Sequence, residues 1–140
     1  MYYHYGYTRA HVEVLRSRCR RARMSAAPGF WTAPAWQLRE CYNGIGPERW
    51  ARRWRRWVTL ELRRFEPSAL AHDWEFSCAP RTYLHFTIAN TRFFVNSVLE
   101  AWETRVPWLA WHGFWLALVC QLFGWGGFKA TPVRWFERAK

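Results

Sequence analysis

Residues 67–90 read PSALAHDWEFSCAPRTYLHFTIAN, and this stretch predicts two helices joined by a short turn. Pro67 suits the first turn of a helix, where the amide hydrogen that proline lacks would have no partner. Pro80 cannot continue a helix and pushes the residue before it toward extended backbone, so the first helix should end there. A second helix should then run over residues 82–103.

His72 is the residue of this stretch that is suited to proton transfer. It lies nine residues before Arg81 in the turn, and Asn90 lies nine residues after Arg81. In an antiparallel hairpin with so short a turn, the two side chains should lie at the same level. A neutral histidine can take a proton from water. The spacing therefore predicts a general base at His72 with Asn90 as its orienting partner.

Asp73 is the only aspartate in the chain, and it points about 100° further round the same helix than its neighbour. Its carboxylate is a hard oxygen ligand of the kind that Ca²⁺ prefers. Residues 42–47 read YNGIGP, whose glycines reach backbone angles that other residues resist. The amide of Gly44 is expected to donate to an oxyanion. The predicted calcium ligands are Asp73 and the carbonyl oxygens of Tyr42, Gly44 and Gly46.

These motifs resemble those of the secreted phospholipases A2. That family has a Tyr-x-Gly-x-Gly calcium loop, which residues 42–46 match, and a helix with His-Asp-x-x-Tyr, which residues 72–76 match in part. Small phospholipase A2-like proteins of bacteriophages and prophages are more similar still, with an Asn-Gly-x-Gly loop, a Phe-Glu-Pro helix entry and an ending like residues 122–128. The resemblance covers about residues 40–128. It implies a phospholipase A2-like antiparallel helical hairpin and calcium-dependent hydrolysis of the sn-2 ester of a phospholipid.

Three features depart from the family pattern. Phe76 stands where the family has a tyrosine, Asn90 stands where it has an aspartate, and its paired cysteines are absent. An amide can hold an imidazole in one tautomer, but it does not stabilise an imidazolium as a carboxylate does. Glu75 lies one turn from His72 and is expected to face solvent, so it should not replace the missing carboxylate.

Two tryptophan-rich segments flank this hairpin. Residues 47–64 predict an extra basic helix with tryptophans on one face and arginines over most of the rest. Such a helix can either pack its tryptophans on the core or lie at a membrane interface. Residues 106–128 carry no formal charge and are long enough to span a bilayer. Their tryptophans, polar side chains and glycine cluster favour a buried or interfacial C-terminal helix over a spanning one.

The composition fits a mainly α domain that attracts anions. The chain has 140 residues, a formal net charge of +11 and twelve tryptophans. A surface of this sign attracts phosphate groups, whether in lipid, in nucleic acid or on a protein partner. The cysteines form no CxxC pair, which argues against a zinc ribbon and favours reduced thiols. They are Cys19, Cys41, Cys78 and Cys120.

The chain is expected to divide into a basic arm and linker at 1–34, a phospholipase A2-like domain at 35–128 and a basic tail at 129–140. The arm should be helical over about residues 9–23 and solvated. No apolar signal stretch opens the chain, so synthesis in the host cytoplasm without Sec export is expected. The product would then reach the membrane or be carried in a virion.

Two functions of different classes fit these observations. The first is a phage- or prophage-type phospholipase A2-like protein that hydrolyses or docks to bacterial membrane phospholipid, with an anionic membrane as its partner and Ca²⁺ as its cofactor. The second is a catalytically degenerate structural or virion component on the same scaffold, whose basic face binds a protein partner or nucleic acid. Charge alone also fits a nucleic-acid binder.

Overall fold

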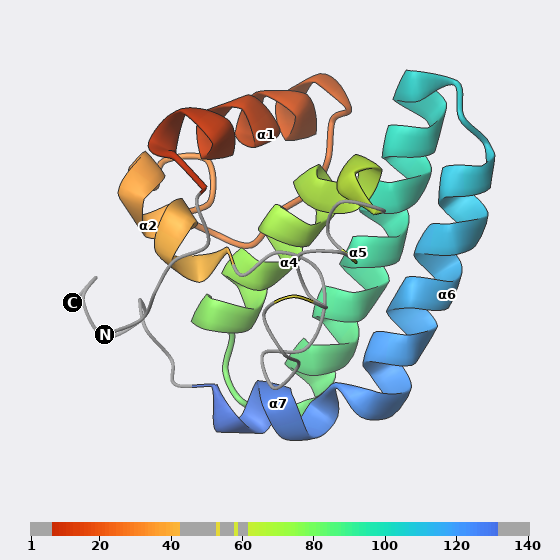
Figure 1. The fold of residues 1–140 in the computed structure, drawn as a ribbon. Helices are drawn as coiled ribbons and strands as arrows, with labels where there is room; N and C mark the ends of the chain where they lie inside the picture. The colour runs from red at the N-terminus through yellow and green to blue at the C-terminus, as the bar shows by residue number, and fades with distance from the viewer. Residues whose placement is uncertain (1–6, 43–52, 54–57, 59–61, 132–140) are drawn as a thin grey trace.

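The computed structural model describes residues 7–42, 53, 58 and 62–131, and Figure 1 shows how they fold. These residues form helices and no strand, which confirms the mainly α class predicted from the sequence. The elements, in chain order, are α1 (Arg9–Arg21), α2 (Ala35–Cys41), the 3₁₀ helix η1 (Arg63–Phe65), α4 (Glu66–Cys78), α5 (Tyr83–Thr104), α6 (Trp108–Phe123) and α7 (Trp125–Ala130).

α4 and α5 are the two helices expected on either side of the short turn. α4 has a proline in its first turn and ends before the second proline, for the reasons the sequence suggests. Thr82 caps α5, because its side chain accepts a hydrogen bond from the amide of His85 at 3.3 Å. The helices run antiparallel, since the hydroxyl of Ser68 in the first turn of α4 donates to Glu100 near the end of α5 at 3.4 Å.

Arg81 fastens the turn between α4 and α5. Its guanidinium donates to the carbonyl oxygens of Phe76 at 2.6 Å and Ala79 at 2.8 Å. It also donates to the carbonyl oxygen of Thr131 at 2.7 Å and lies 4.8 Å from the ring centre of Phe128. Phe76 belongs to α4, Phe128 belongs to α7, and Thr131 directly follows α7. The Arg81 side chain therefore links the hairpin turn to the C-terminal end of the described residues.

The main core joins α1, α2 and α4. Val12, Leu15 and Cys19 lie on one face of α1 and are buried. They pack in one cluster with Leu38 of α2 and Leu70 of α4. A fully buried apolar side chain stabilises a fold by about 1.5–3 kcal/mol. α1 is therefore part of the packed core and not the solvated arm that its arginines suggest.

α1 is also two residues shorter than expected. It ends at Arg21, and Arg23 adopts the left-handed conformation with φ 55°. The domain boundaries expected near residues 34 and 128 stay predictions, but α1 shares its core with elements on the far side of the first boundary. None of the four cysteines, all of which lie within the described residues, is in a disulfide, and three of them are buried.

α6 lies along α5, and the two helices approach closely (Figure 1). A Cβ placed on Gly113 of α6 would lie 2.3 Å from the Cβ of Ser97 on α5. The tryptophan-rich segment 106–128 is divided at Gly124 into α6 and α7. Among the described helices, none has the length and apolar character needed to cross a bilayer. The spanning interpretation of this segment is therefore not supported.

The basic tryptophan helix expected at 47–64 lies mostly outside the described residues, and so do Gly44 and Gly46. Its expected last two residues belong to η1, which leads directly into α4.

Candidate functional site

The predicted pairing of His72 and Asn90 is present. Nε2 of His72 on α4 lies 3.0 Å from Oδ1 of Asn90 on α5. Asn90 is buried at 3% exposure, so its amide needs partners within the protein. The symmetric spacing of the two residues about Arg81 therefore predicts the contact correctly, because the short turn leaves the helices in register.

A third helix determines which way the Asn90 amide points. Nδ2 of Asn90 donates to Oε1 of Gln121 on α6 at 2.8 Å. Nε2 of Gln121 in turn donates to the hydroxyls of Tyr83 and Thr87, each at 3.0 Å. An amide nitrogen only donates and an amide oxygen only accepts. Because the Asn90 nitrogen is engaged by Gln121, its oxygen is the atom that faces His72.

This chain of amides defines the tautomer of His72. A carbonyl oxygen accepts, so Nε2 of His72 carries the hydrogen and donates it to Asn90. In the neutral ring the other nitrogen, Nδ1, then holds an unshared electron pair. Nδ1 lies 3.9 Å from Oδ1 of Asp73, which is longer than a hydrogen bond. Nδ1 is therefore the ring nitrogen that lies nearer the Asp73 carboxylate.

Aromatic rings surround the imidazole on the sides away from these polar partners. The ring centre of Phe76 lies 4.1 Å from that of His72, and the ring centre of Phe93 lies at 5.3 Å. The His72 side chain is only 10% exposed. Phe76 therefore contributes an apolar packing surface to the His72 ring.

Glu75 is not exposed, which corrects the expectation that it faces solvent. It is buried at 5% exposure, and its Oε1 accepts a hydrogen bond from Arg92 of α5 at 2.6 Å. Burial raises the pKa of the Glu75 carboxyl, and the charges of Arg92 and His72 oppose this shift. The long-range pairing with Arg92 explains the burial, because a buried carboxylate needs an ionic or hydrogen-bonding partner.

Tyr42, a predicted calcium ligand, is buried, and its phenol feels the charge of Asp73. Burial raises the pKa of the Tyr42 phenol, and the charges of Glu66, Tyr7 and Asp73 add to this shift. The phenol itself donates to Oε1 of Glu66 at 3.1 Å, so only the carbonyl of Tyr42 is a candidate metal ligand.

The described residues cover only part of the predicted calcium site. Ca²⁺ takes about six to eight oxygens. Within the described part of the chain, no group of three or more His, Cys, Asp or Glu side chains is placed to hold a metal ion. The donor chemistry of Asp73 and the Tyr42 carbonyl suits Ca²⁺, and the expected partners Gly44 and Gly46 lie outside the described residues. Convergence of the four ligands stays a prediction.

Cys120 and Gln121 extend the site onto α6, which the sequence motifs do not cover. Burial raises the pKa of the Cys120 thiol to about 11, and the Asp73 charge adds to this effect. The raised pKa disfavours the thiolate of Cys120 at neutral pH. Gln121 had one signal in the sequence, since it is a polar residue within a long uncharged segment.

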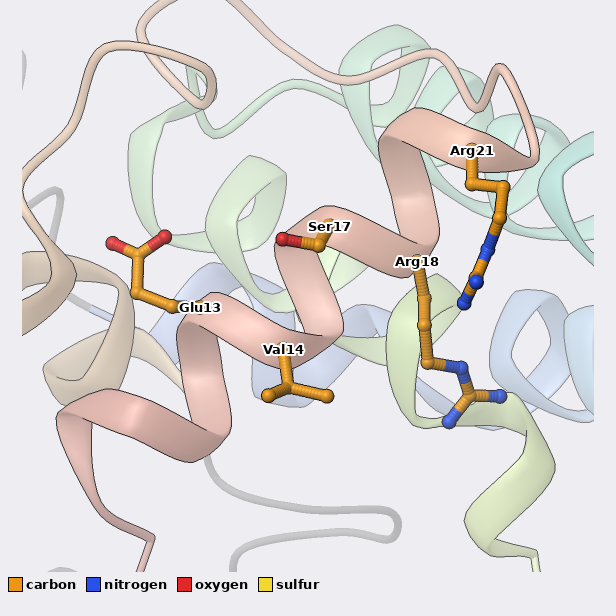
Figure 2. A pocket seen from close by; sticks show the side chains of 5 residues that line it. All are labelled: Glu13, Val14, Ser17, Arg18 and Arg21. Atoms are coloured by element: carbon orange, nitrogen blue, oxygen red, sulfur yellow. The ribbon is translucent and has the colours of Figure 1, made fainter.

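A hollow apart from His72 lies on the outer face of α1 (Figure 2). Its charged groups are already paired, because Glu13 pairs with Arg16 at 2.5 Å and Arg18 pairs with Glu100 at 2.7 Å. Its lining residues are Glu13, Val14, Ser17, Arg18 and Arg21. This hollow lacks the oriented polar chain that marks the site around His72.

Comparison of this chain with protein-family models, with curated protein sequences and with solved structures found no match in any of the three.

Proposed function

We propose that this protein is a phospholipase A2-like lipid hydrolase of the phage or prophage type, in which His72 is the general base. The observation that carries the proposal is the hydrogen-bonded chain from His72 through Asn90 to Gln121. A structural histidine needs only one satisfied nitrogen. Here the hydrogen-bonded chain spans three helices and leaves the unprotonated nitrogen 3.9 Å from an oxygen of Asp73, the one aspartate of the chain.

In the proposed reaction, a water molecule beside Nδ1 of His72 attacks the ester carbonyl carbon of a phospholipid. Nδ1 takes one proton from this water as the new C–O bond forms. The imidazolium that results keeps its Nε2 hydrogen bond to Asn90 and lies beside the carboxylate of Asp73. It then gives its proton to the departing alkoxide oxygen as the ester C–O bond breaks, which returns His72 to its neutral form.

Calcium would be held by Asp73 and the carbonyl oxygen of Tyr42, together with Gly44 and Gly46, and would supply positive charge to the ester oxygen. Asp73 therefore has two candidate partners in this proposal, the metal ion and the His72 imidazolium. The substrate is a phospholipid in an anionic bacterial membrane, toward which the net charge of +11 attracts the protein.

The alternative is a catalytically degenerate component, such as a small virion protein, that binds a partner or nucleic acid through its basic surface. The amide of Asn90 favours it, because a neutral amide stabilises an imidazolium less than a carboxylate does. Phe76 favours it as well, because its ring replaces a hydroxyl with an apolar contact 4.1 Å from the His72 ring.

The decisive experiment measures fatty-acid release from phosphatidylglycerol-containing vesicles with Ca²⁺ and with a chelator. The full chain should release fatty acid only with Ca²⁺. His72→Gln should lower the rate by about 10²–10⁴-fold, which is the usual contribution of a general base. The matched control is His85→Gln, since His85 also lies on the hairpin but its ring pairs with the hydroxyl of Thr82 at 2.7 Å instead of with Asn90.

Two further variants test the polar chain itself. Gln121→Leu should lower kcat with little effect on the fold, because the Asn90 amide loses the partner that orients it. Asn90→Asp should raise kcat by placing a carboxylate beside the imidazolium. Absence of hydrolysis in both the natural chain and Asn90→Asp, with Ca²⁺ and anionic lipid present, would overturn the hydrolase proposal and favour the degenerate component.

A further inference from the structure

α5 and α6 each carry several exposed apolar side chains. On α5 a stripe at helical spacing is exposed to solvent, and it consists of Leu84, Ile88, Val95, Val98 and Trp102. Trp102 is 86% exposed, which is unusual for the largest apolar side chain. One side of α5 therefore packs on α4 and α6, and another side is apolar without being covered by the described residues.

α6 packs along α5 (Figure 1) and carries an exposed apolar stripe of its own. Its exposed members are Trp108, Trp111, Trp115, Val119, Leu122 and Phe123. We refer to the two stripes together as the α5–α6 apolar face. Soluble monomers rarely expose a contiguous apolar patch of more than a few hundred Å², and larger patches mark binding surfaces.

Cations lie at both ends of this face. At one end, the guanidinium of Arg64 lies 5.7 Å from the ring centre of Trp108. Arg105 occupies the turn between α5 and α6 at the same end and is exposed. At the other end, Nζ of Lys129 lies 5.9 Å from the ring centre of Trp125. The face is thus an uncharged centre with basic residues at its two ends.

This distribution of charge decides between two possible occupants. A second copy of the chain would bring arginine and lysine against arginine and lysine, and Glu103, an acidic residue at the Arg105 end, already lies 3.8 Å from Arg21. An anionic bilayer instead offers phosphates to the cations and an apolar layer to the centre. Tryptophan is also the side chain most suited to the boundary between headgroups and hydrocarbon.

We infer that the α5–α6 apolar face docks the protein on an anionic bilayer, with α6 lying in the plane of the headgroup layer. α6 has 16 residues and is about 24 Å long, and interfacial helices of this kind lie along the surface. The inference rests on the proposed function and names its membrane-binding surface. α6 also carries Gln121, so the helix that contacts lipid is the one that orients the Asn90 amide.

The test is co-sedimentation with vesicles of phosphatidylglycerol and phosphatidylcholine, and with vesicles of phosphatidylcholine alone. Leu122→Arg and Trp102→Arg should each weaken binding to the anionic vesicles by about tenfold or more, because each removes a buried apolar contact with lipid. The matched control is Val14→Arg, since Val14 is 57% exposed on α1, on another face of the molecule. It should bind within about twofold of the natural chain, because added positive charge alone does not weaken anionic binding.

The membrane-docking inference and the hydrolase proposal can fail independently of each other. His72→Gln should bind vesicles like the natural chain, whatever its effect on hydrolysis, because the His72 side chain is only 10% exposed and is not a member of the face. If Leu122→Arg and Trp102→Arg both bind as the natural chain does, the inference is wrong even if hydrolysis is observed. It is also wrong if analytical ultracentrifugation shows a dimer of the natural chain that these two substitutions dissociate, since a second copy then occupies the face.

Discussion

His72 shows how one side chain can depend on residues far from it in sequence. Its ring orientation depends on Asn90, and the orientation of that amide depends on Gln121, which is 31 residues further along the chain. Each link is a hydrogen bond with a defined donor, so reversing any one of these hydrogen bonds would change which nitrogen of His72 carries the hydrogen. The chemistry of His72 is therefore a property of three helices.

Glu100 is a second buried side chain with long-range partners. Its carboxylate pairs with Arg18 of α1 at 2.7 Å and accepts a hydrogen bond from Ser68 of α4 at 3.4 Å. Burial raises the pKa of the Glu100 carboxyl from 4.5 to about 7, since desolvation outweighs the opposing effect of Arg18.

A pH dependence of stability follows from this shift. As pH rises from about 4.5 to about 7, the unfolded chain releases the Glu100 proton before the folded chain does. The contribution of Glu100 to the free energy of unfolding is thus fully present below a pH of about 4.5 and is lost as the pH rises to about 7. We expect urea unfolding at about pH 5 and about pH 8 to show the natural chain losing stability relative to Glu100→Gln. The control variant, Glu103→Gln, should lose about as much stability between the two pH values as the natural chain does. Equal losses of stability in Glu100→Gln and Glu103→Gln would contradict the prediction.

At the scale of elements, α5 and α6 pack closely because small side chains lie between them. Gly113 faces Ser97, and an added methyl group would lie 2.3 Å from the Ser97 Cβ. Neither atom belongs to a flexible end of a side chain, so the helices themselves would have to move apart. The same contact brings Gln121 within reach of α5, which links helix packing to the candidate site.

Gly113→Ala should therefore destabilise the protein by about 1–3 kcal/mol, because overpacking outweighs the better helix propensity of alanine. The matched control is Gly126→Ala in α7, where nothing lies within 4 Å of the added Cβ. The control should be neutral or stabilising by up to about 1 kcal/mol. Urea unfolding of both variants measures the difference, and equal stability of the two would show that α5 and α6 separate freely.

At the scale of the whole molecule, the N-terminal helix belongs to the same core as the hairpin. Leu15 of α1 and Phe30 of the following segment are both fully buried, at 1% and 0% exposure. They share one cluster with Leu70 of α4. A basic surface and a buried apolar stripe thus coexist on α1, where Arg20 and Arg21 are exposed while Arg18 reaches the buried Glu100.

Removal of residues 1–34 should therefore prevent folding of the remainder, residues 35–140. The deletion exposes the apolar surface of α4 that α1 covers and removes the ionic partner of Glu100. Far-UV circular dichroism with thermal melting is the measurement, and the shortened chain should show no cooperative transition. A cooperative transition near that of the full chain would instead support an independent domain that begins at residue 35.

The sequence alone was sufficient for the α4–α5 hairpin and for the pairing of His72 with Asn90. Two prolines set the ends of the first helix, and a short turn with helical periodicity sets the register of the pair. These are local effects, so they can be derived without knowing what else the helices touch. The tryptophan-rich segment 106–128 could also be identified from the sequence as a candidate helix, because its lack of charge is visible in the residues themselves.

Only the tertiary structure decided how those helices are used. Glu75 is buried because Arg92 lies opposite it, α1 is packed because α4 covers its apolar face, and Gln121 meets Asn90 because Gly113 lets α6 approach α5. Each of these contacts joins residues far apart in the chain, and its free energy depends on which helix faces pack together. Sequence periodicity identifies an apolar face, but the partner of that face is determined by the packing of the whole molecule.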